Sequence, residues 1–448
     1  MLQNMTEGKP LGLIIPFMIP LLIGNVFQQL YNIADIIIVG RTIGVEALAA
    51  VGGISPLFML AMMLTVGMGN GFAVITGQRY GAEDLPGVRR SVGSGVVLSI
   101  FTVLILMGLM HLCIDYLMDL MNMPAELVED ARSYVMIIVD GLIFMMGYNY
   151  LSAIMRSLGD SKTPLYFLII ASVANIILAL VFIIYLGWGV PGSAIAMVLA
   201  QALSGILCVG YIYYKFPDLH LALNDFKINW FEAKEHLRMG IPMGMQFSVI
   251  SVGIMVLQSV CNKFGGEQIA GFTTAARVEQ LAVQPMVSIG IAMAVFTAQN
   301  FGARKFDRIR EAAKKCSMLA FVYSLSAAIL MFVFGKQIIG IFLDNPSEGV
   351  MRAAGMYILC SVPAYLFFSQ MFIYRNACQG MGIAAVPFLA STVELVMRCG
   401  SAIFLANSLG FIAICIGSPI AWTMGAVFVY LSFRYFIRIL EKKYVEVN

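Results

Sequence analysis

The amino-acid sequence predicts an all-α fold, a polytopic membrane protein of twelve transmembrane helices in two pseudo-symmetric six-helix lobes. Of the 448 residues, 60% are hydrophobic and only 12% are charged, whereas soluble domains carry about 25% charged residues. Apolar runs of about 20 residues, the length that spans a bilayer as a helix, recur along the whole chain. The two halves of the chain also repeat one another, which predicts two lobes of the same architecture.

Charged residues, glycines, prolines and asparagines separate the apolar runs and mark the ends of the predicted spans. The predicted spans of the first half are 11–40, 53–76, 92–114, 132–156, 163–186 and 190–214, and those of the second half are 238–261, 275–298, 316–342, 354–379, 384–407 and 411–436. The longest polar interval separates the two sets. We therefore predict an N-terminal lobe over 1–214, a cytoplasmic linker over 215–237 and a C-terminal lobe over 238–448.

Sequence blocks of the first half recur in the second half at a nearly constant spacing. Gln78 in ITGQRYGAE matches Gln299 in FTAQNFGAR, and Gly159 matches Gly382 at almost the same separation along the chain. Because each half contains an even number of spans, the two repeats have the same orientation in the membrane, with a cleft between them. This arrangement predicts a carrier that works by alternating access, although a two-lobed structural scaffold would repeat in the same way.

Lysine and arginine are distributed unequally between the two sides of the predicted spans. Both termini and the loops of one side carry 21 of these residues, the loops of the other side carry six, and Arg398 lies within a span. Cytoplasmic loops carry an excess of Lys and Arg. We therefore expect the side with 21 basic residues, and both termini, to lie in the cytoplasm.

Several classes of protein are excluded by composition and motif spacing. The formal net charge of +3, from 28 Lys and Arg against 25 Asp and Glu, is too balanced to indicate nucleic-acid binding. The eight cysteines are scattered without the paired spacing of metal ligands. Neither a Ser/His/Asp nor a Cys/His set occurs at a meaningful spacing, so we do not expect an enzyme. The glycines of GMGNGF at 67–72 lie inside an apolar run, where helix packing or a kink explains them better than a phosphate loop.

The first predicted span carries a stripe of polar residues. Gln28, Asn32 and Asp35 are three and four residues apart, which places them on one face of a helix, and Tyr31 lies on the same arc. An aspartate at bilayer depth costs about 2.5–3.5 kcal/mol, so such residues usually face a protein interior or a wet cavity. The alternative is that Asp35 lies near the outer interface and is solvated there.

Polar residues of the fourth and fifth spans are candidates to complete this site. Tyr134, Asp140 and Asn149 lie in the fourth span and Asn175 in the fifth. Asp140 and Asn149 are nine residues apart, on opposite sides of a helix, so only one of them faces Asp35. A carboxylate among amides and a phenol would hold a proton or offer oxygens to a small hard cation. For each amide taken alone, interhelical hydrogen bonding is the alternative role.

The second half carries different chemistry. Arg398 is the counterpart of Asn175, and Glu394 precedes it by one helical turn, so the two form a structural ion pair or contact a substrate. Glu279 lies near the outer end of its span with Gln284 below it, and the alternative to a functional role is that Glu279 is a solvated entrance residue. Gln246 and Gln258 are weaker candidates. The 31 methionines and 30 phenylalanines suit a permissive cavity for apolar or cationic guests, although most of them are expected to face lipid or pack between helices.

Several of these blocks resemble the multidrug and toxic compound extrusion (MATE) family, in its prokaryotic branch that includes DNA-damage-inducible protein F. The blocks that carry the resemblance are NVFQQLYNIADIIIVGRTIGVEALAAVG, ITGQRYGA, SAIMRSLGDSKTP, GIPMGMQ, AARVEQLAVQP and FTAQNFGARKFDRIR. The resemblance covers nearly all twelve spans. It implies two six-helix lobes in a V shape and export of cationic or amphipathic drugs, driven by inward flow of Na⁺ or H⁺.

The resemblance also implies a coupling site in the N-terminal lobe. Carried over to this chain, the acid of the first span is Asp35, the amide of the fourth is Asn149 and the amide of the fifth is Asn175. Asn32, Tyr134 and Asp140 are further candidates for ion coupling from their positions alone. The family pattern has an aspartate four residues after the last amide, where this chain has Ala179. A Na⁺ site at Asp35 and Asn175 would lose a charge and one or two oxygen ligands. The departure therefore favours H⁺, unless Asp140 replaces the missing acid.

Together these observations predict an antiporter for small organic molecules in a bacterial inner or plasma membrane. We expect it to work as a monomer with no cofactor other than its coupling ion and no other metal. Gln28, Tyr31, Gln246, Gln284, Glu394 and Arg398 are the predicted substrate contacts. A flippase for lipid-linked precursors is the alternative within the same superfamily, and a channel or a non-transporting receptor is the alternative from another class.

Overall fold

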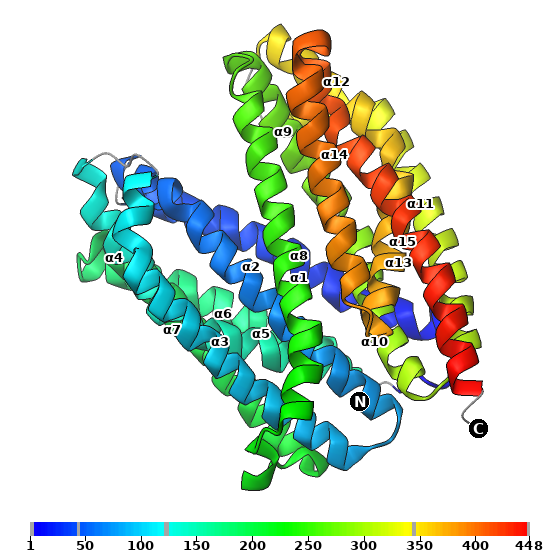
Figure 1. Cartoon of the computed structure of the whole chain (residues 1–448). Coiled ribbons are helices and arrows are strands. Elements are labelled where there is room, and N and C mark those ends of the chain that lie inside the picture. Colours follow the sequence, from blue (N-terminus) through cyan, green and yellow to red (C-terminus); the bar gives the residue numbers. More distant parts are fainter. Residues whose placement is uncertain (1–3, 43–44, 121–124, 343–345, 446–448) are drawn as a thin grey trace. The chain divides into compact units, whose positions relative to one another are not determined.

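The computed structural model describes residues 4–42, 45–120, 125–342 and 346–445, apart from the side chains of 30–37, 39–41, 45–58, 120, 125, 218, 444 and 445. The helices of the first half are α1 (Pro10–Thr42), α2 (Val45–Gly81), α3 (Leu85–Leu120), α4 (Ala125–Asp140), α5 (Leu142–Ser157), α6 (Lys162–Leu180) and α7 (Gly189–Lys215). Those of the second half are α8 (Trp230–Cys261), α9 (Gly266–Ala282), α10 (Gln284–Gly302), α11 (Phe306–Phe342), α12 (Glu348–Ser361), α13 (Tyr365–Gly380), α14 (Ala385–Leu409) and α15 (Phe411–Val445) (Figure 1). A π-helical turn, η1 (Val181–Tyr185), extends α6, and 3-10 turns form η2 (Pro217–Leu219), η3 (Leu223–Phe226) and η4 (Val362–Ala364).

The helices confirm the predicted all-α polytopic fold. Within the described residues, ten helices are long and apolar enough to cross a membrane, and counting two bent pairs as spans gives up to twelve. The bends are 45° between α4 and α5 and 43° between α9 and α10. At the first bend, a Cβ on Gly141 would lie 2.2 Å from Cγ2 of Val198 in α7, so only glycine fits there. At the second, Pro285 is the second residue of α10 and cannot donate a helical hydrogen bond.

Contacts divide the chain into two compact units. Unit 1 consists of Met1–Asn4 and Ile23–Gly244, and unit 2 of Met5–Leu22 and Met245–Asn448. The divisions fall within α1 and within α8, and their separation along the chain matches the spacing of the sequence repeat. Each division also follows a proline by two residues, Pro20 in α1 and Pro242 in α8. Each crossing helix therefore begins in one unit and ends in the other.

Unit 1 is built around α2, which packs against α3, α4 and α5. The first half of α8 lies very close to α2, because a Cβ on Gly67 would be 2.5 Å from the Met243 carbonyl oxygen and a Cβ on Gly71 would be 2.7 Å from Cα of Gly240. Gly67 and Gly71 of GMGNGF thus permit contact between two helix backbones, which is the close packing predicted for this block. The start of α8 is also held by Arg79, which donates hydrogen bonds to both carboxylate oxygens of Glu232, at 3.1 and 2.8 Å.

Unit 2 holds the N-terminal segment in the equivalent way. The backbone N–H of Met5 donates to Oε1 of Gln299 at 2.9 Å, and Nδ2 of Asn300 donates to the Met5 carbonyl, also at 2.9 Å. Arg308 donates to the Gly8 carbonyl at 2.7 Å. Asn300 is the repeat counterpart of Arg79. Equivalent positions of the two halves therefore hold the chain near the beginning of α1 and near the beginning of α8.

Candidate functional site: buried polar side chains in the two units

The C-terminal half of α1 lies beside α6 and α7 in unit 1. Ala179, Ile183 and Ala196 form a small buried cluster, and Ile38 of α1 packs against it. Asn175 precedes Ala179 by one turn of α6 and is only 2% exposed. Its amide nitrogen Nδ2 has no hydrogen-bond partner among the described residues. A buried, unused donor thus lies one turn from the contact between α1 and this cluster.

The predicted stripe on α1 is only partly described. Gln28 is half-buried, whereas the side chains of Tyr31, Asn32 and Asp35 lie outside the described residues. The backbone of α1 is helical through all of these positions. Position 35 therefore precedes Ile38 by nearly one turn.

The polar residues of the fourth span separate from one another. Tyr134 is buried in α4, and Asp140 ends that helix with a 58% exposed side chain whose Oδ1 is 3.4 Å from Nε2 of His111 in α3. Asn149 is half-buried in α5 and donates from Nδ2 to the Met145 carbonyl of its own helix at 2.8 Å. The described contact of Asp140 is therefore with α3, and the described contact of Asn149 is within α5.

Unit 2 contains a buried ionic cluster. Glu394 in α14 accepts a hydrogen bond at Oε1 from Nη1 of Arg375 in α13 at 3.3 Å, and its Oε2 is 4.0 Å from Nη2 of Arg398. The three side chains are each between 3% and 6% exposed. The predicted pair of Glu394 and Arg398 is therefore present, and a second arginine joins it. The guanidinium of Arg375 also lies over the ring of Phe372, 4.1 Å from its centre.

Sequence reasoning missed Arg375 as a member of this cluster. Arg375 lies four residues before the end of the predicted span 354–379. The count of basic residues on each side of the membrane assigns it to the loop that follows this span. The structure instead places it on the buried face of α13. The available signal was its position inside an apolar span, where a base needs an acidic partner.

Glu279 is a second acid inside unit 2. Its Oε1 accepts a hydrogen bond from the Tyr357 hydroxyl of α12 at 3.0 Å, and its Oε2 is buried without a hydrogen-bond partner in the part of the chain that the structure describes. Arg398 is close enough to interact with it electrostatically. The interpretation of Glu279 as a solvated entrance residue is therefore wrong, because α12 covers its carboxylate.

The two predicted glutamines of unit 2 are also buried. Oε1 of Gln246 in α8 accepts a hydrogen bond from Nε2 of Gln379 in α13 at 2.9 Å. Gln284 begins α10, and its carbonyl accepts a hydrogen bond from the Ser288 hydroxyl. Among the described residues, no group of three or more His, Cys, Asp and Glu side chains could hold a metal ion.

These features define the class of the protein. Paired ionisable side chains buried within apolar spans mark membrane proteins that move ions or solutes, and two parallel repeats of six spans are typical of secondary transporters. The family model MatE matches residues 20–181 and again 242–403, two segments related by the same spacing as the units. The chain belongs to this family, the multidrug and toxic compound extrusion transporters.

Similar proteins extend over nearly the whole chain. The "Probable multidrug resistance protein YpnP" of Bacillus subtilis is 26% identical over 437 residues, which are 96% of this chain and 96% of that protein. The crystal structure of MATE in the bent conformation has a TM-score of 0.90 at 27% identity and covers 98% of each chain. An outward-facing multidrug resistance MATE family transporter has a TM-score of 0.89 at 26% identity, with 98% of each chain covered. The predicted family, fold and assignment as a transporter rather than an enzyme are confirmed.

Proposed function

We propose that this chain is an antiporter of the bacterial inner or plasma membrane that exports cationic or amphipathic organic molecules in exchange for H⁺ or Na⁺. Its similarity to a multidrug resistance protein supports this class of substrate. The unequal distribution of basic residues supports cytoplasmic termini. In this proposal one chain is sufficient for transport. The lobes 1–214 and 238–448, joined by 215–237, expose the substrate site to each side of the membrane in turn.

Asp35 is the proposed coupling acid, and the contact of Ile38 with the cluster around Ala179 is the observation that carries this proposal. By the predicted topology, α1 and α6 are the first and fifth spans and cross the membrane in the same direction. Position 35 is about one turn before Ile38, and Asn175 is one turn before Ala179, so the two positions have similar depth. An unused amide donor suits an ionised carboxylate as its acceptor.

The residue at position 179 favours H⁺ over Na⁺ as the coupling ion. Ala179 offers no side-chain oxygen, and Na⁺, like other hard cations, needs several oxygen ligands. A single carboxylate is sufficient to carry a proton. Protonation would discharge Asp35 and remove the preference for the Asn175 donor, which would change the packing of α1 and release substrate. Asp140 is a weaker replacement acid because its carboxylate is exposed and faces His111.

Transport in proteoliposomes tests this proposal. Asp35→Asn should retain substrate binding but lower gradient-driven efflux at least tenfold, whereas Asp119→Asn, which neutralises an exposed acid of the same unit, should leave efflux unchanged. Efflux driven by a pH gradient alone and by a Na⁺ gradient alone would identify the ion. Wild-type efflux by Asp35→Asn would disprove the coupling role.

A flippase for lipid-linked precursors is the second candidate, and Arg375 is the observation that favours it. Two arginines share the carboxylate of Glu394, and their guanidinium groups are the donors that would bind a pyrophosphate. In the same vesicles, translocation of a lipid-linked pyrophosphate that Arg375→Gln abolishes would support this function. Unitary currents would indicate a channel, and absence of any substrate movement would indicate a receptor.

A further inference from the structure

Unit 2 has a basic pocket at the end where α11 begins and α15 ends. The cavity has a volume of about 560 Å³, within the range of about 300–1,000 Å³ that is typical of small-ligand sites. Its lining residues come from α11, α13 and α15 and are Arg310, Ala313, Lys314, Tyr374, Tyr430, Phe433, Arg434, Ile437 and Arg438. We call these residues the basic pocket.

The charge of the basic pocket is mostly uncompensated. Arg310 forms a two-point ion pair with Glu441. For Lys314, Arg434 and Arg438, the structure shows no carboxylate within 4 Å among the residues it describes. Three positive charges therefore converge on one cavity. Repulsion among them disfavours the empty pocket and favours an anion.

Aromatic rings form the inner wall of the pocket and orient one of its cations. Tyr374 packs edge-to-face on Tyr430 at 5.0 Å and against Phe433 at 5.2 Å. Arg434 donates from Nη1 to the Tyr430 hydroxyl at 3.0 Å, and its guanidinium lies 5.8 Å from the centre of that ring. Arginine and tyrosine at the end of a membrane span are the pair expected at the headgroup level of a bilayer.

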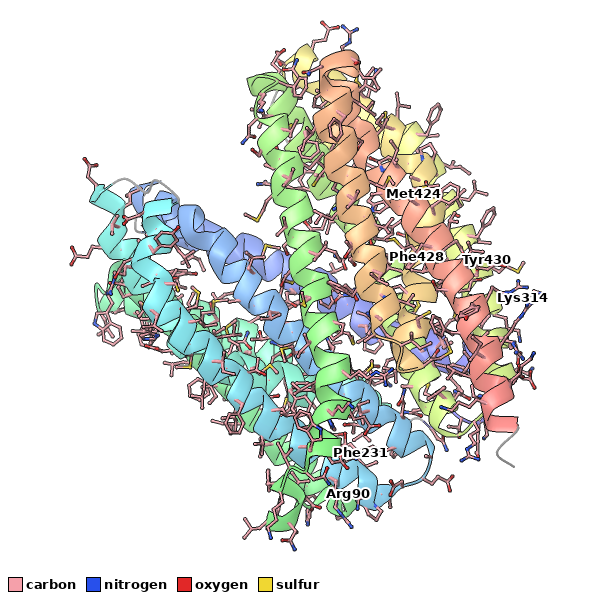
Figure 2. The ribbon with its side chains drawn as sticks, in the orientation of Figure 1. Arg90, Phe231, Lys314, Met424, Phe428 and Tyr430 are labelled. Atoms are coloured by element: carbon pink, nitrogen blue, oxygen red, sulfur yellow. The ribbon has the colours of Figure 1, made fainter. Side chains whose placement is uncertain are left out.

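Exposed apolar side chains continue from the basic pocket along both helices. On α11, Met318 and Val322 follow Lys314 at four-residue spacing and are 72% and 54% exposed. On α15, Leu431 and Val427 precede Arg434 on one face and are 59% and 48% exposed. Figure 2 shows Lys314 and Tyr430 on the same side of unit 2, with Met424 further along α15 and away from its C-terminal end. Cationic and apolar surface therefore follow one another in the order of a phospholipid's headgroup and acyl chains.

We propose that the basic pocket binds the phosphate of an anionic phospholipid, whose acyl chains lie along the exposed apolar faces of α11 and α15. Basic pockets between membrane helices bind anionic lipid headgroups. A zwitterionic headgroup would bring its own cation close to Lys314 and Arg438, and a free phosphate would leave the apolar faces unused. The pocket lies wholly within unit 2, and the site needs neither Asp35 nor the proposed antiport.

Binding of defined lipids to the delipidated full-length protein tests the proposal. Native mass spectrometry in detergent would follow titration with phosphatidylglycerol, with phosphatidylcholine and with inorganic phosphate. Each basic residue near a membrane surface contributes about fivefold in affinity for anionic lipid. Lys314→Gln with Arg438→Gln should therefore weaken phosphatidylglycerol binding about twenty-five-fold, and Lys314→Arg with Arg438→Lys should retain it within about threefold.

The matched control is Lys227→Gln with Arg238→Gln, which removes one lysine and one arginine from exposed positions outside the pocket. This variant should bind phosphatidylglycerol within twofold of wild type. Equal binding of phosphatidylcholine, or equal loss in the control, would overturn the proposal. Displacement of phosphatidylglycerol by millimolar inorganic phosphate would identify a free-phosphate site and would also overturn it. Melting temperatures without added lipid would show that each variant is folded.

Discussion

The buried cluster of Arg375, Glu394 and Arg398 allows a prediction whose magnitude depends on which partner is removed. Glu394→Gln would leave two buried guanidinium groups without their carboxylate, and breaking a buried pair in this way costs about 3–5 kcal/mol. Arg375→Gln would leave Glu394 with Arg398, 4.0 Å away, and would remove one hydrogen bond between charged groups, worth about 1.5–3 kcal/mol. Loss of the acid should therefore destabilise the protein about 2 kcal/mol more than loss of the base.

The double variant gives the sharper test. Once Glu394 is neutral, Arg375 is an unpaired buried cation, so adding Arg375→Gln to Glu394→Gln should restore part of the lost stability. Denaturant titrations of the purified protein in detergent would give the unfolding free energies. Glu129→Gln, at an exposed acid of α4, should change the free energy by less than about 0.5 kcal/mol. Additive costs for the two single variants, or a larger cost for Arg375→Gln, would refute the reasoning.

Two further predictions concern contacts of unit 1. Gly71→Ala should destabilise the protein by about 1–3 kcal/mol in the same titrations, because its Cβ would lie 2.7 Å from Cα of Gly240. Gly108→Ala, with nothing within 4 Å, should be neutral or stabilising, and equal effects at both glycines would contradict the close packing. Arg79→Gln should speed proteolysis between α7 and α8 severalfold by releasing Glu232 at the start of α8. An unchanged cleavage rate would show that this contact does not hold α8.

Hydropathy predicts which segments are helices because the length of an apolar run sets a membrane span. It does not predict where they end. The predicted span 92–114 continues as α3 to Leu120, since polar residues such as Asp115 interrupt the apolar run without breaking helical hydrogen bonds. It also does not predict the bend at Gly141, where the space for a side chain is taken by Val198 of another helix. Contacts between helices are the information that a single sequence does not display.

The same limit applies to the candidate sites. Glu394 and Arg398 could be paired from the sequence because they are one turn apart on one helix. The ion pair of Arg375 with Glu394 links two helices, and helical periodicity relates only residues of the same helix. The stripe of Gln28, Asn32 and Asp35 rests on that periodicity alone, and its role in coupling stays a prediction.

The repeat places different chemistry at equivalent positions of the two units. Asn175 and Arg398 are counterparts, and Tyr134 and Tyr357 are counterparts at the same spacing. In unit 1 the buried position carries a neutral amide whose Nδ2 has no hydrogen-bond partner in the described part of the chain, whereas in unit 2 it carries a fixed cation beside Glu394. Unit 2 therefore already holds its own cation at this position, which is a physical reason to look for the coupling ion on α1 and α6.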